Sequence, residues 1–266
     1  MKVTVIGGGA AGAMCAVLAA RGGADVTLLE KNEKTGKKLF ITGKGRCNLT
    51  ADLPPAEFLE GVVHGEKFLR GAVWSFSSAD TKKFFEDEGV PLVTERGNRV
   101  FPASGKSSDI TRALDRALKD SGVRVELNAE VRRAEKRGEK FAAVLADGRE
   151  FLSDALVVAT GGKSYPSTGS TGDGYVFAEK FGHSVVKPVP SLVQLITKEN
   201  VSPLNGLSLK NVTLSAEVPG GKTVSEFGEM LFTKRGISGP VALTLSARLN
   251  RVGGARLHLD LKPALT

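Results

Sequence analysis

The sequence has few cysteines, few histidines and no long apolar run, and each shortage excludes a class of protein. Its two cysteines, Cys15 and Cys47, do not form a CxxC motif, so a dithiol redox centre is excluded. Its three histidines are widely separated and lack metal-ligand spacing, so no metal site is predicted. No apolar run is long enough to cross a membrane. With so few cysteines, we expect a reducing, cytoplasmic location.

Acidic residues are also in deficit, which gives the chain a formal net charge of +8. Such a charge can attract a nucleic acid or an anionic membrane surface. The basic residues are spread from Lys2 to Lys262 without a block of like charge, and no nucleic-acid motif accompanies them. We therefore expect a small-molecule substrate and no nucleic acid, while the oligomeric state is not indicated.

The 266 residues suffice for one large or two modest domains. Helix-like and strand-like patterns alternate until Pro188 and Pro190, which indicate a crossing between domains. From residue 191 onward, short strand-like runs are separated by Gly and Pro, as in a small barrel or sandwich. The pattern predicts an α/β, Rossmann-like domain over residues 1–188 and a β-rich, small-barrel domain over 189–266.

A glycine-rich turn follows the first predicted strand. Residues 2–6 are typical of a buried parallel strand, and Gly7, Gly9 and Gly12 then form G-x-G-x-x-G at the start of a predicted helix. In this motif the first glycine permits a tight turn, the second leaves room for a diphosphate, and the third lets the helix pack closely. The helix N-terminus offers free N–H groups to phosphate.

A second predicted strand, residues 25–30, ends in an acid. Glu30 lies 18 residues after Gly12, where a carboxylate can accept hydrogen bonds from ribose hydroxyls. It also disfavours NADP, because it would repel a 2′-phosphate. A glycine-rich turn without function does not explain Glu30, so we predict dinucleotide binding.

The tract "TGKGRCN", residues 42–48, belongs to a cationic stretch that begins at Lys31. It lacks the spacing of a Walker A loop. A lysine-rich surface loop is the alternative. Against it, Gly43 and Gly45 let backbone N–H groups approach a ligand, and Arg46 can pair with a diphosphate.

A second signature ends the predicted strand "ALVVATGG", residues 155–162. Small residues are expected where the backbone runs close to a cofactor. Two separated signatures on one chain favour FAD over NAD as the tightly held nucleotide.

Together, these tracts resemble bacterial predicted flavoproteins of the aminoacetone-oxidase or BaiN-like type, which are NAD(P)/FAD-dependent oxidoreductases. "GRCN" is the most specific tract, and residues 97–110, 157–175 and 228–246 match as well. The resemblance implies an FAD-binding fold of the glutathione-reductase kind with an inserted β-rich domain. It also implies that Val131 lies at the adenine and that six residues line the FAD, namely Lys38, Gly43, Gly45, Arg46, Cys47 and Asn48. For Cys47 we favour a packed thiol over a reactive one.

The predicted cofactor-binding residues combine both lines of reasoning. They are Gly7, Gly9, Ala10, Ala11, Gly12, Glu30, Lys31, Lys38, Thr42, Gly43, Gly45, Arg46, Cys47, Asn48, Val131, Ala159, Thr160, Gly161 and Gly162.

The resemblance implies an FAD-dependent oxidoreductase with NADH or NADPH as reductant and with an unassigned substrate. No catalytic acid or base is indicated. Because related flavoproteins continue past this point with a third glycine-rich segment, we expect this chain to be the N-terminal part of such a protein. The alternatives are an NAD-linked dehydrogenase and a nucleotide-binding module without redox activity.

Overall fold

The computed structural model describes residues 1–218, 220 and 223–265. The chain divides into two compact units, Met1–Val185 and Val186–Thr266. Each is described by itself.

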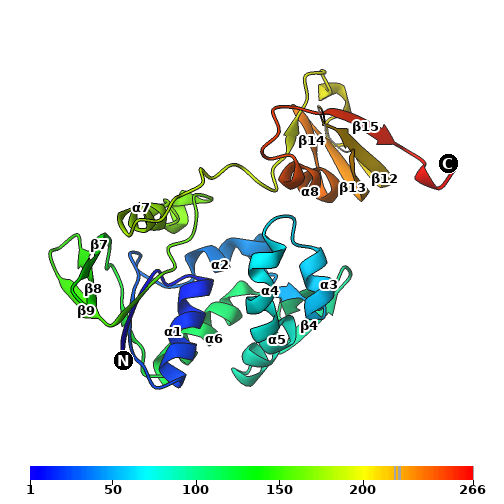
Figure 1. Cartoon of the computed structure of the whole chain (residues 1–266). Coiled ribbons are helices and arrows are strands. Elements are labelled where there is room, and N and C mark those ends of the chain that lie inside the picture. The colour runs from blue at the N-terminus through cyan, green and yellow to red at the C-terminus, as the bar shows by residue number, and fades with distance from the viewer. Residues whose placement is uncertain (219, 221–222, 266) are drawn as a thin grey trace. The chain divides into compact units, whose positions relative to one another are not determined.

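The first unit is built on a parallel sheet with strand order β10-β1-β2-β6. Helices α1 and α6 cover one face of it (Figure 1). Because side chains alternate across a strand, Val5 and Leu28 pack under these helices while Ile6 and Leu29 point to the opposite face. The elements are β1 (Lys2–Ile6), α1 (Ala10–Arg21), β2 (Asp25–Leu29), α6 (Ser107–Asp120), β6 (Arg124–Glu126) and β10 (Ala155–Val158).

The opposite face is covered by an antiparallel sheet, β7-β8-β9, and by helix α7. Ile6 and Leu29 belong there to a buried cluster with Val131, Leu145 and Phe177. Apolar cover on both faces is what a parallel sheet requires. The elements are β7 (Val131–Arg137), β8 (Lys140–Leu145), β9 (Glu150–Ser153) and α7 (Asp173–Lys180).

A third sheet and several short helices complete the first unit. Helix α5 begins with a capping box, in which Ser77 and Asp80 exchange side-chain and backbone hydrogen bonds. The sheet has the order β3-β5-β4. The elements are α2 (Lys37–Ile41), η1 (Thr42–Gly45), β3 (Thr50–Ala51), α3 (Pro55–Glu60), α4 (Glu66–Ser75), α5 (Ser78–Asp87), β4 (Leu92–Glu95), β5 (Arg99–Pro102) and η2 (Pro166–Thr168).

The second unit is a five-stranded antiparallel sheet, β11-β14-β13-β12-β15, packed against helix α8. The predicted β-rich character is confirmed. Within the described residues the sheet is open, with β11 and β15 at its edges. The elements are β11 (Leu195–Ile196), η3 (Ser202–Leu204), β12 (Ser208–Glu217), β13 (Val224–Thr233), β14 (Gly236–Ser238), α8 (Pro240–Arg248), β15 (Arg256–Asp260) and η4 (Pro263–Leu265).

Residues 123–131, "VRVELNAEV", have the sequence pattern of one continuous strand, but β6 ends at Glu126 and β7 begins at Val131. The end of β2 causes the break, because Glu30 N donates to the Glu126 carbonyl at 2.9 Å and Ala129 N donates to the Glu30 carbonyl at 2.8 Å. The chain must leave the sheet between these two bonds.

None of the helices in the described part of the chain combines the length and the apolar character that a membrane crossing demands.

Candidate functional site

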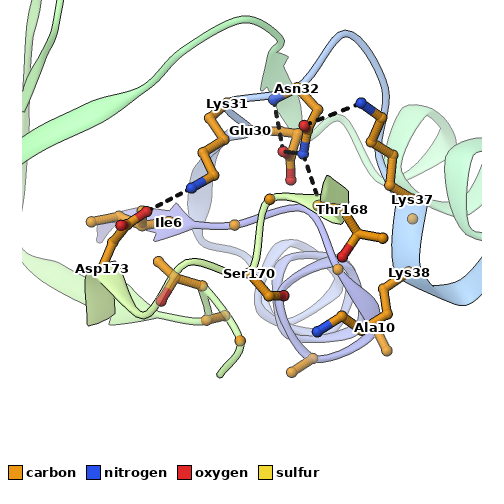
Figure 2. A pocket seen from close by; sticks show the side chains of 18 of the residues that line it. Ile6, Ala10, Glu30, Lys31, Asn32, Lys37, Lys38, Thr168, Ser170 and Asp173 are labelled. Carbon is orange, nitrogen blue, oxygen red and sulfur yellow. Dashed lines mark hydrogen bonds and ion pairs between the residues drawn. The ribbon is translucent and has the colours of Figure 1, made fainter. Parts of the chain in front are cut away.

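A cavity of about 370 Å³ opens at the carboxyl ends of β1, β2 and β10 (Figure 2). Ligands of open α/β sheets bind at this edge. Three segments line most of it, namely the turn after β1, the segment from Leu29 to Thr42, and the segment from Ala159 to Asp173. The lining residues are Ile6, Gly7, Gly9, Ala10, Ala11, Leu29, Glu30, Lys31, Asn32, Gly36, Lys37, Lys38, Leu39, Thr42, Ala129, Val131, Ala159, Thr160, Gly161, Thr168, Gly169, Ser170, Asp173 and Phe177.

The three glycines of the first turn occupy different surroundings. A Cβ atom on Gly12 would lie 1.8 Å from the Gly7 carbonyl oxygen, so Gly12 brings α1 against the turn without lining the cavity. A Cβ on Gly7, whose φ is 106°, would lie 2.5 Å from the Ala159 carbonyl oxygen. A Cβ on Gly9 would meet no atom within 4 Å. Gly9 therefore borders open space at the start of α1.

The N-terminus of α1 presents backbone donors at this space. Gly9 is the N-cap, and no side chain caps the helix there. The first intrahelical bond runs from Ala13 N to the Gly9 carbonyl, so the N–H groups of residues 10–12 have no partner inside the helix. Such a terminus favours an anion.

Glu30 lies at the cavity with its carboxylate held by N–H groups. Its side chain is buried, and Oε2 accepts a hydrogen bond from Gly8 N at 2.7 Å. Oε1 accepts from Asn32 N at 2.8 Å and from Asn32 Nδ2 at 2.5 Å. In the described residues Glu30 forms no salt bridge, so its charge is met by hydrogen bonds alone.

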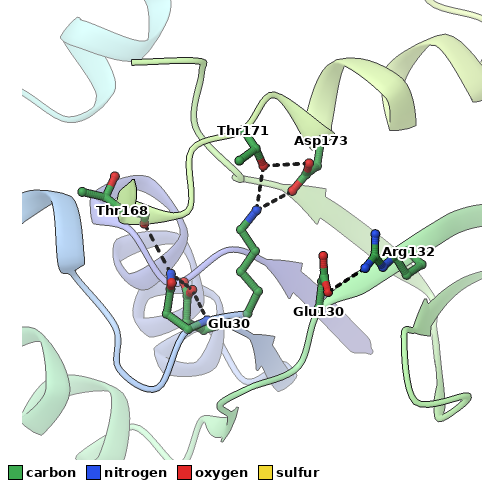
Figure 3. A network of polar contacts seen from close by, with 8 residues as sticks. Glu30, Glu130, Arg132, Thr168, Thr171 and Asp173 are labelled. Atoms are coloured by element: carbon green, nitrogen blue, oxygen red, sulfur yellow. Dashed lines mark hydrogen bonds and ion pairs between the residues drawn. The ribbon is translucent and has the colours of Figure 1, made fainter. Parts of the chain in front are cut away.

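Lys31 points to Asp173 in the segment after β10 (Figure 2), where Asp173 lies beside Thr171 (Figure 3). Its Nζ donates to Thr171 Oγ1 at 2.8 Å and to Asp173 Oδ2 at 2.7 Å. Burial alone would raise the pKa of Asp173, but the hydrogen bonds from Lys31 and Thr171 and the nearby cations outweigh it, and the pKa is lowered. Asp173 is therefore ionised at neutral pH.

Two further lysines, Lys37 and Lys38, line the cavity from α2. Lys38 Nζ donates to the Ser164 carbonyl at 2.7 Å, which again joins the segment after β2 to the segment after β10. Lys37 Nζ pairs with Glu33 at 2.8 Å. These lysines bring positive charge to the cavity.

The GRCN tract, together with Gly43 before it, lies outside the cavity lining, whereas Thr42 belongs to the lining. The predicted residues of this loop that lie outside it are Gly43, Gly45, Arg46, Cys47 and Asn48. The backbone turns away here, because Gly43, Lys44, Gly45 and Cys47 all have positive φ. The predicted contacts of these five residues with FAD therefore stay a prediction.

The tract's side chains are engaged with β3, β4 and β5. Arg46 Nη1 donates to Glu95 Oε2 at 3.3 Å, and the Arg46 guanidinium lies 4.2 Å from the centroid of the Phe101 ring. With its amide oriented so that donors meet acceptors, Asn48 donates to the Val100 and Thr50 carbonyls, both at 3.1 Å. Arg46 and Asn48 thus hold this loop to the third sheet.

Cys47 is buried and is 2% exposed. Burial raises the pKa of its thiol, and a hydrogen bond with Thr42 opposes this only in part. A neutral, buried thiol is unreactive, in agreement with the packed role favoured from the sequence.

In the second signature, Ala159, Thr160 and Gly161 line the cavity and Gly162 does not. Gly162 lies under Tyr175, whose hydroxyl would be 3.3 Å from an added Cβ. Val131 lines the cavity beside Ala129, and its contact with the adenine stays a prediction.

The sequence interpretation missed several lining residues, above all Asn32, Thr168, Gly169, Ser170 and Asp173. The Ser- and Gly-rich tract "STGSTGDG", residues 167–174, was a signal for four of them. Asn32 is a single amide in a charged loop, and its neighbours in sequence gave no signal.

The sequence matches the family described as "HI0933-like protein Rossmann domain" over residues 1–257. The 3-dehydro-bile acid delta(4,6)-reductase of Clostridium scindens is 34% identical over 93% of this chain and 60% of that protein. The ribosomal RNA dihydrouridine synthase of Haemophilus influenzae is 34% identical over 91% of this chain and 60% of that protein. The chain spans about three fifths of the length of these curated relatives.

Among solved structures, the 3-ketosteroid-delta4-(5alpha)-dehydrogenase of Rhodococcus jostii matches with 20% identity and a TM-score of 0.45, over 61% of this chain and 46% of that chain. A similarity this distant says nothing about function. The family match confirms the family and the Rossmann-like fold class that the motifs predicted.

Proposed function

Since this chain belongs to the HI0933-like protein Rossmann domain family, we propose that it is the FAD-binding part of an oxidoreductase that reduces a carbon–carbon double bond. The observation that carries the proposal is the single cavity lined by both glycine signatures and by Glu30. Residues 1–188 would form the FAD-binding domain and residues 189–266 part of an inserted β-rich domain.

The residues around the cavity fit the adenosine and diphosphate end of FAD. Gly9 leaves open space in front of the free N–H groups of α1, where a diphosphate is favoured. Glu30 is placed to accept hydrogen bonds from a ribose. Lys37 and Lys38 add positive charge that suits a diphosphate. The GRCN loop would contact the ribityl or flavin portion.

When bound, the flavin supplies the two-electron redox chemistry. This chain's residues would bind the nucleotide and orient it. NADH or NADPH would be the reductant and be oxidised to NAD⁺ or NADP⁺. The double bond would gain two electrons and two protons, one proton coming with the hydride equivalent and one from water.

The choice of a double bond rests on the names of the two relatives. One is a delta(4,6)-reductase, and the other makes dihydrouridine, which is uridine with one ring double bond saturated. A steroid and a nucleobase share little except a double bond next to a carbonyl group. Reduction of such a bond is the reaction class common to both names.

RNA is a second candidate substrate beside a small molecule. The sequence-based expectation of no nucleic acid is not supported, because one relative is named for ribosomal RNA. Residues 186–266 contain ten Lys and Arg against five Asp and Glu. Among the described residues of this unit, Arg248–Glu226 is the one Lys or Arg salt bridge. Exposed cations such as Lys198, Lys234 and Arg235 are thus available to phosphates.

Titration of the purified chain with FAD, FMN and NAD⁺, followed by flavin fluorescence and calorimetry, tests the proposal. We expect FAD to bind more tightly than either FMN or NAD⁺, because the cavity suits the adenosine diphosphate portion and the GRCN loop the flavin end. Binding of NAD⁺ without binding of FAD would indicate an NAD-linked dehydrogenase instead.

RNA binding is tested separately, by fluorescence anisotropy of a labelled single-stranded RNA at several salt concentrations. The K234Q/R235Q double variant should bind more weakly and with a shallower salt dependence, by up to about two charges. Equal RNA binding by the variant and the wild type would show that Lys234 and Arg235 do not contribute to RNA binding.

A further inference from the structure

We propose that Asn32 is a positioning residue that aims the Glu30 carboxylate at a ribose 2′-hydroxyl, so that the cavity selects ribonucleotides over 2′-deoxyribonucleotides. The inference rests on the proposed function, since it concerns the nucleotide that the cavity would hold. It adds a residue, Asn32, that the glycine and acid motifs do not contain.

The Glu30 carboxylate has a fixed orientation. Gly8 N holds Oε2 at 2.7 Å, and Asn32 N and Nδ2 hold Oε1 at 2.8 and 2.5 Å. A carboxylate has about four lone-pair sites, and these three bonds leave a site for one more donor. A ribose hydroxyl in the cavity is such a donor.

The Asn32 amide has one chemically acceptable orientation. Its Oδ1 accepts a hydrogen bond from Lys37 Nζ at 3.3 Å, and its Nδ2 faces Glu30 and the Thr168 carbonyl, the latter at 3.3 Å (Figure 2). The reversed amide would place its oxygen against two other oxygens and its nitrogen against an ammonium group. Asn32 therefore donates to Glu30.

The same amide keeps a cation away from Glu30. Lys37 Nζ reaches the oxygen of the Asn32 amide and the Glu33 carboxylate, and it does not reach Glu30. Without the amide, the Lys37 ammonium can pair with Glu30 and occupy the lone pair that a hydroxyl needs. Asn32 thus preserves Glu30 as a hydrogen-bond acceptor.

Asn32 also joins the segment after β2 to the segment after β10 at the cavity. Its Nδ2 bonds the Thr168 carbonyl, and a Cβ on Gly169, whose φ is 96°, would lie 2.7 Å from Nδ2. Its own carbonyl accepts from Asn128 N at 3.0 Å. If Asn32 only held these loops together, its removal would weaken the binding of ADP and of 2′-deoxy-ADP alike. In the proposed role, its removal weakens the binding of ADP more than that of 2′-deoxy-ADP.

The test is calorimetric titration of the whole chain with ADP and with 2′-deoxy-ADP. The wild type should prefer ADP about tenfold, which corresponds to one hydrogen bond to a charged group. Asn32→Ala should reduce that preference to about threefold or less. The control Lys34→Gln, which changes an exposed neighbour outside the cavity lining and leaves Lys37 paired with Glu33, should keep the wild-type preference. Asn32→Ser, which removes the amide and adds no charge, serves if the alanine variant does not fold.

The outcomes separate the two proposals. Retention of the full ADP preference in a folded Asn32 variant, or its absence in the wild type, would overturn the role of Asn32. Failure of the wild type to bind ADP and FAD at all would instead overturn the proposed function.

Discussion

The ammonium nitrogen of Lys31 lies 2.7 Å from Oδ2 of Asp173, a residue 142 positions further along the chain. Lys31 directly follows Glu30, and Asp173 begins α7. Both residues line the cavity. One ion pair therefore fixes the distance between the segment after β2 and the segment after β10.

This ion pair predicts a pH-dependent contribution to stability. The pKa of Asp173 is lowered from its ordinary value of 3.8, since the bonds from Lys31 and Thr171 outweigh the opposing effect of burial. A carboxyl whose pKa is lower in the folded state stabilises that state above its ordinary pKa, and this stabilisation is lost as the pH falls through the folded value. Asp173→Asn should lower the free energy of unfolding by about 1 kcal/mol at neutral pH, with allowance for solvent screening.

Urea unfolding at neutral pH and at several values below 3.8 checks this. The difference between the wild type and Asp173→Asn should shrink steadily in acid. A difference that stays constant with pH would show that the ion pair does not account for it.

Close packing of α1 against the first turn predicts that Gly12→Ala is strongly destabilising. The added Cβ would lie 1.8 Å from a backbone oxygen, so the helix or the turn must move. We expect a loss of about 3 kcal/mol or failure to fold. Gly71→Ala is the matched control, because this glycine lies inside α4 with no atom within 4 Å of its added Cβ. The control should be neutral or stabilise by up to about 1 kcal/mol.

Arg46 should affect FAD and ADP differently. It does not line the cavity, and its guanidinium packs on Phe101 beside Glu95, where it lowers the pKa of the Glu95 carboxyl. We expect Arg46→Gln to leave ADP affinity unchanged and to weaken FAD binding, because the partner proposed for this loop is the ribityl or flavin portion. Calorimetry with both ligands decides. Equal losses for ADP and FAD would place Arg46 at the diphosphate or make its effect a general loss of structure.

The two cysteines should differ in reactivity. In a Cys15→Ser variant, the remaining buried Cys47 should react slowly with an aromatic disulfide reagent until denaturant is added, because burial raises the pKa of its thiol. In Cys47→Ser, the partly exposed Cys15 should react faster. Cys47→Ser should also keep its FAD binding. Rapid reaction of Cys47 in the native protein would favour a reactive thiol over a packed one.

The parts of the fold that follow local patterns were predictable from the sequence. The β1 turn, α1 and β2 depend on contacts within about 30 residues, and their glycines and Glu30 have fixed spacings. The break between β6 and β7 was not predictable, because Glu126 and Ala129 are set by bonds to the distant Glu30 backbone.

The same distinction holds for the cavity. The positions of Gly7, Gly9 and Glu30 in the cavity lining were predictable, because these residues belong to a motif with fixed spacing. The contacts of Asn32 with Thr168 and of Asp173 with Lys31 join residues far apart in the chain, so local sequence patterns do not predict these pairings. The GRCN tract was assigned to the cofactor by resemblance, whereas the contacts of Arg46 and Asn48 with the third sheet depend on tertiary folding.

The central claim is that the cavity at the carboxyl ends of β1, β2 and β10 binds the adenosine diphosphate portion of FAD. Its most direct test is the FAD affinity of Gly9→Ala, whose added Cβ enters open cavity space and meets no protein atom within 4 Å. We predict that this variant still folds, with a loss of about 1 kcal/mol because alanine is a poorer N-cap than glycine, and that it loses FAD affinity by more than about tenfold, since the methyl group takes the place of the diphosphate. Undiminished FAD binding by a folded Gly9→Ala variant would contradict the account.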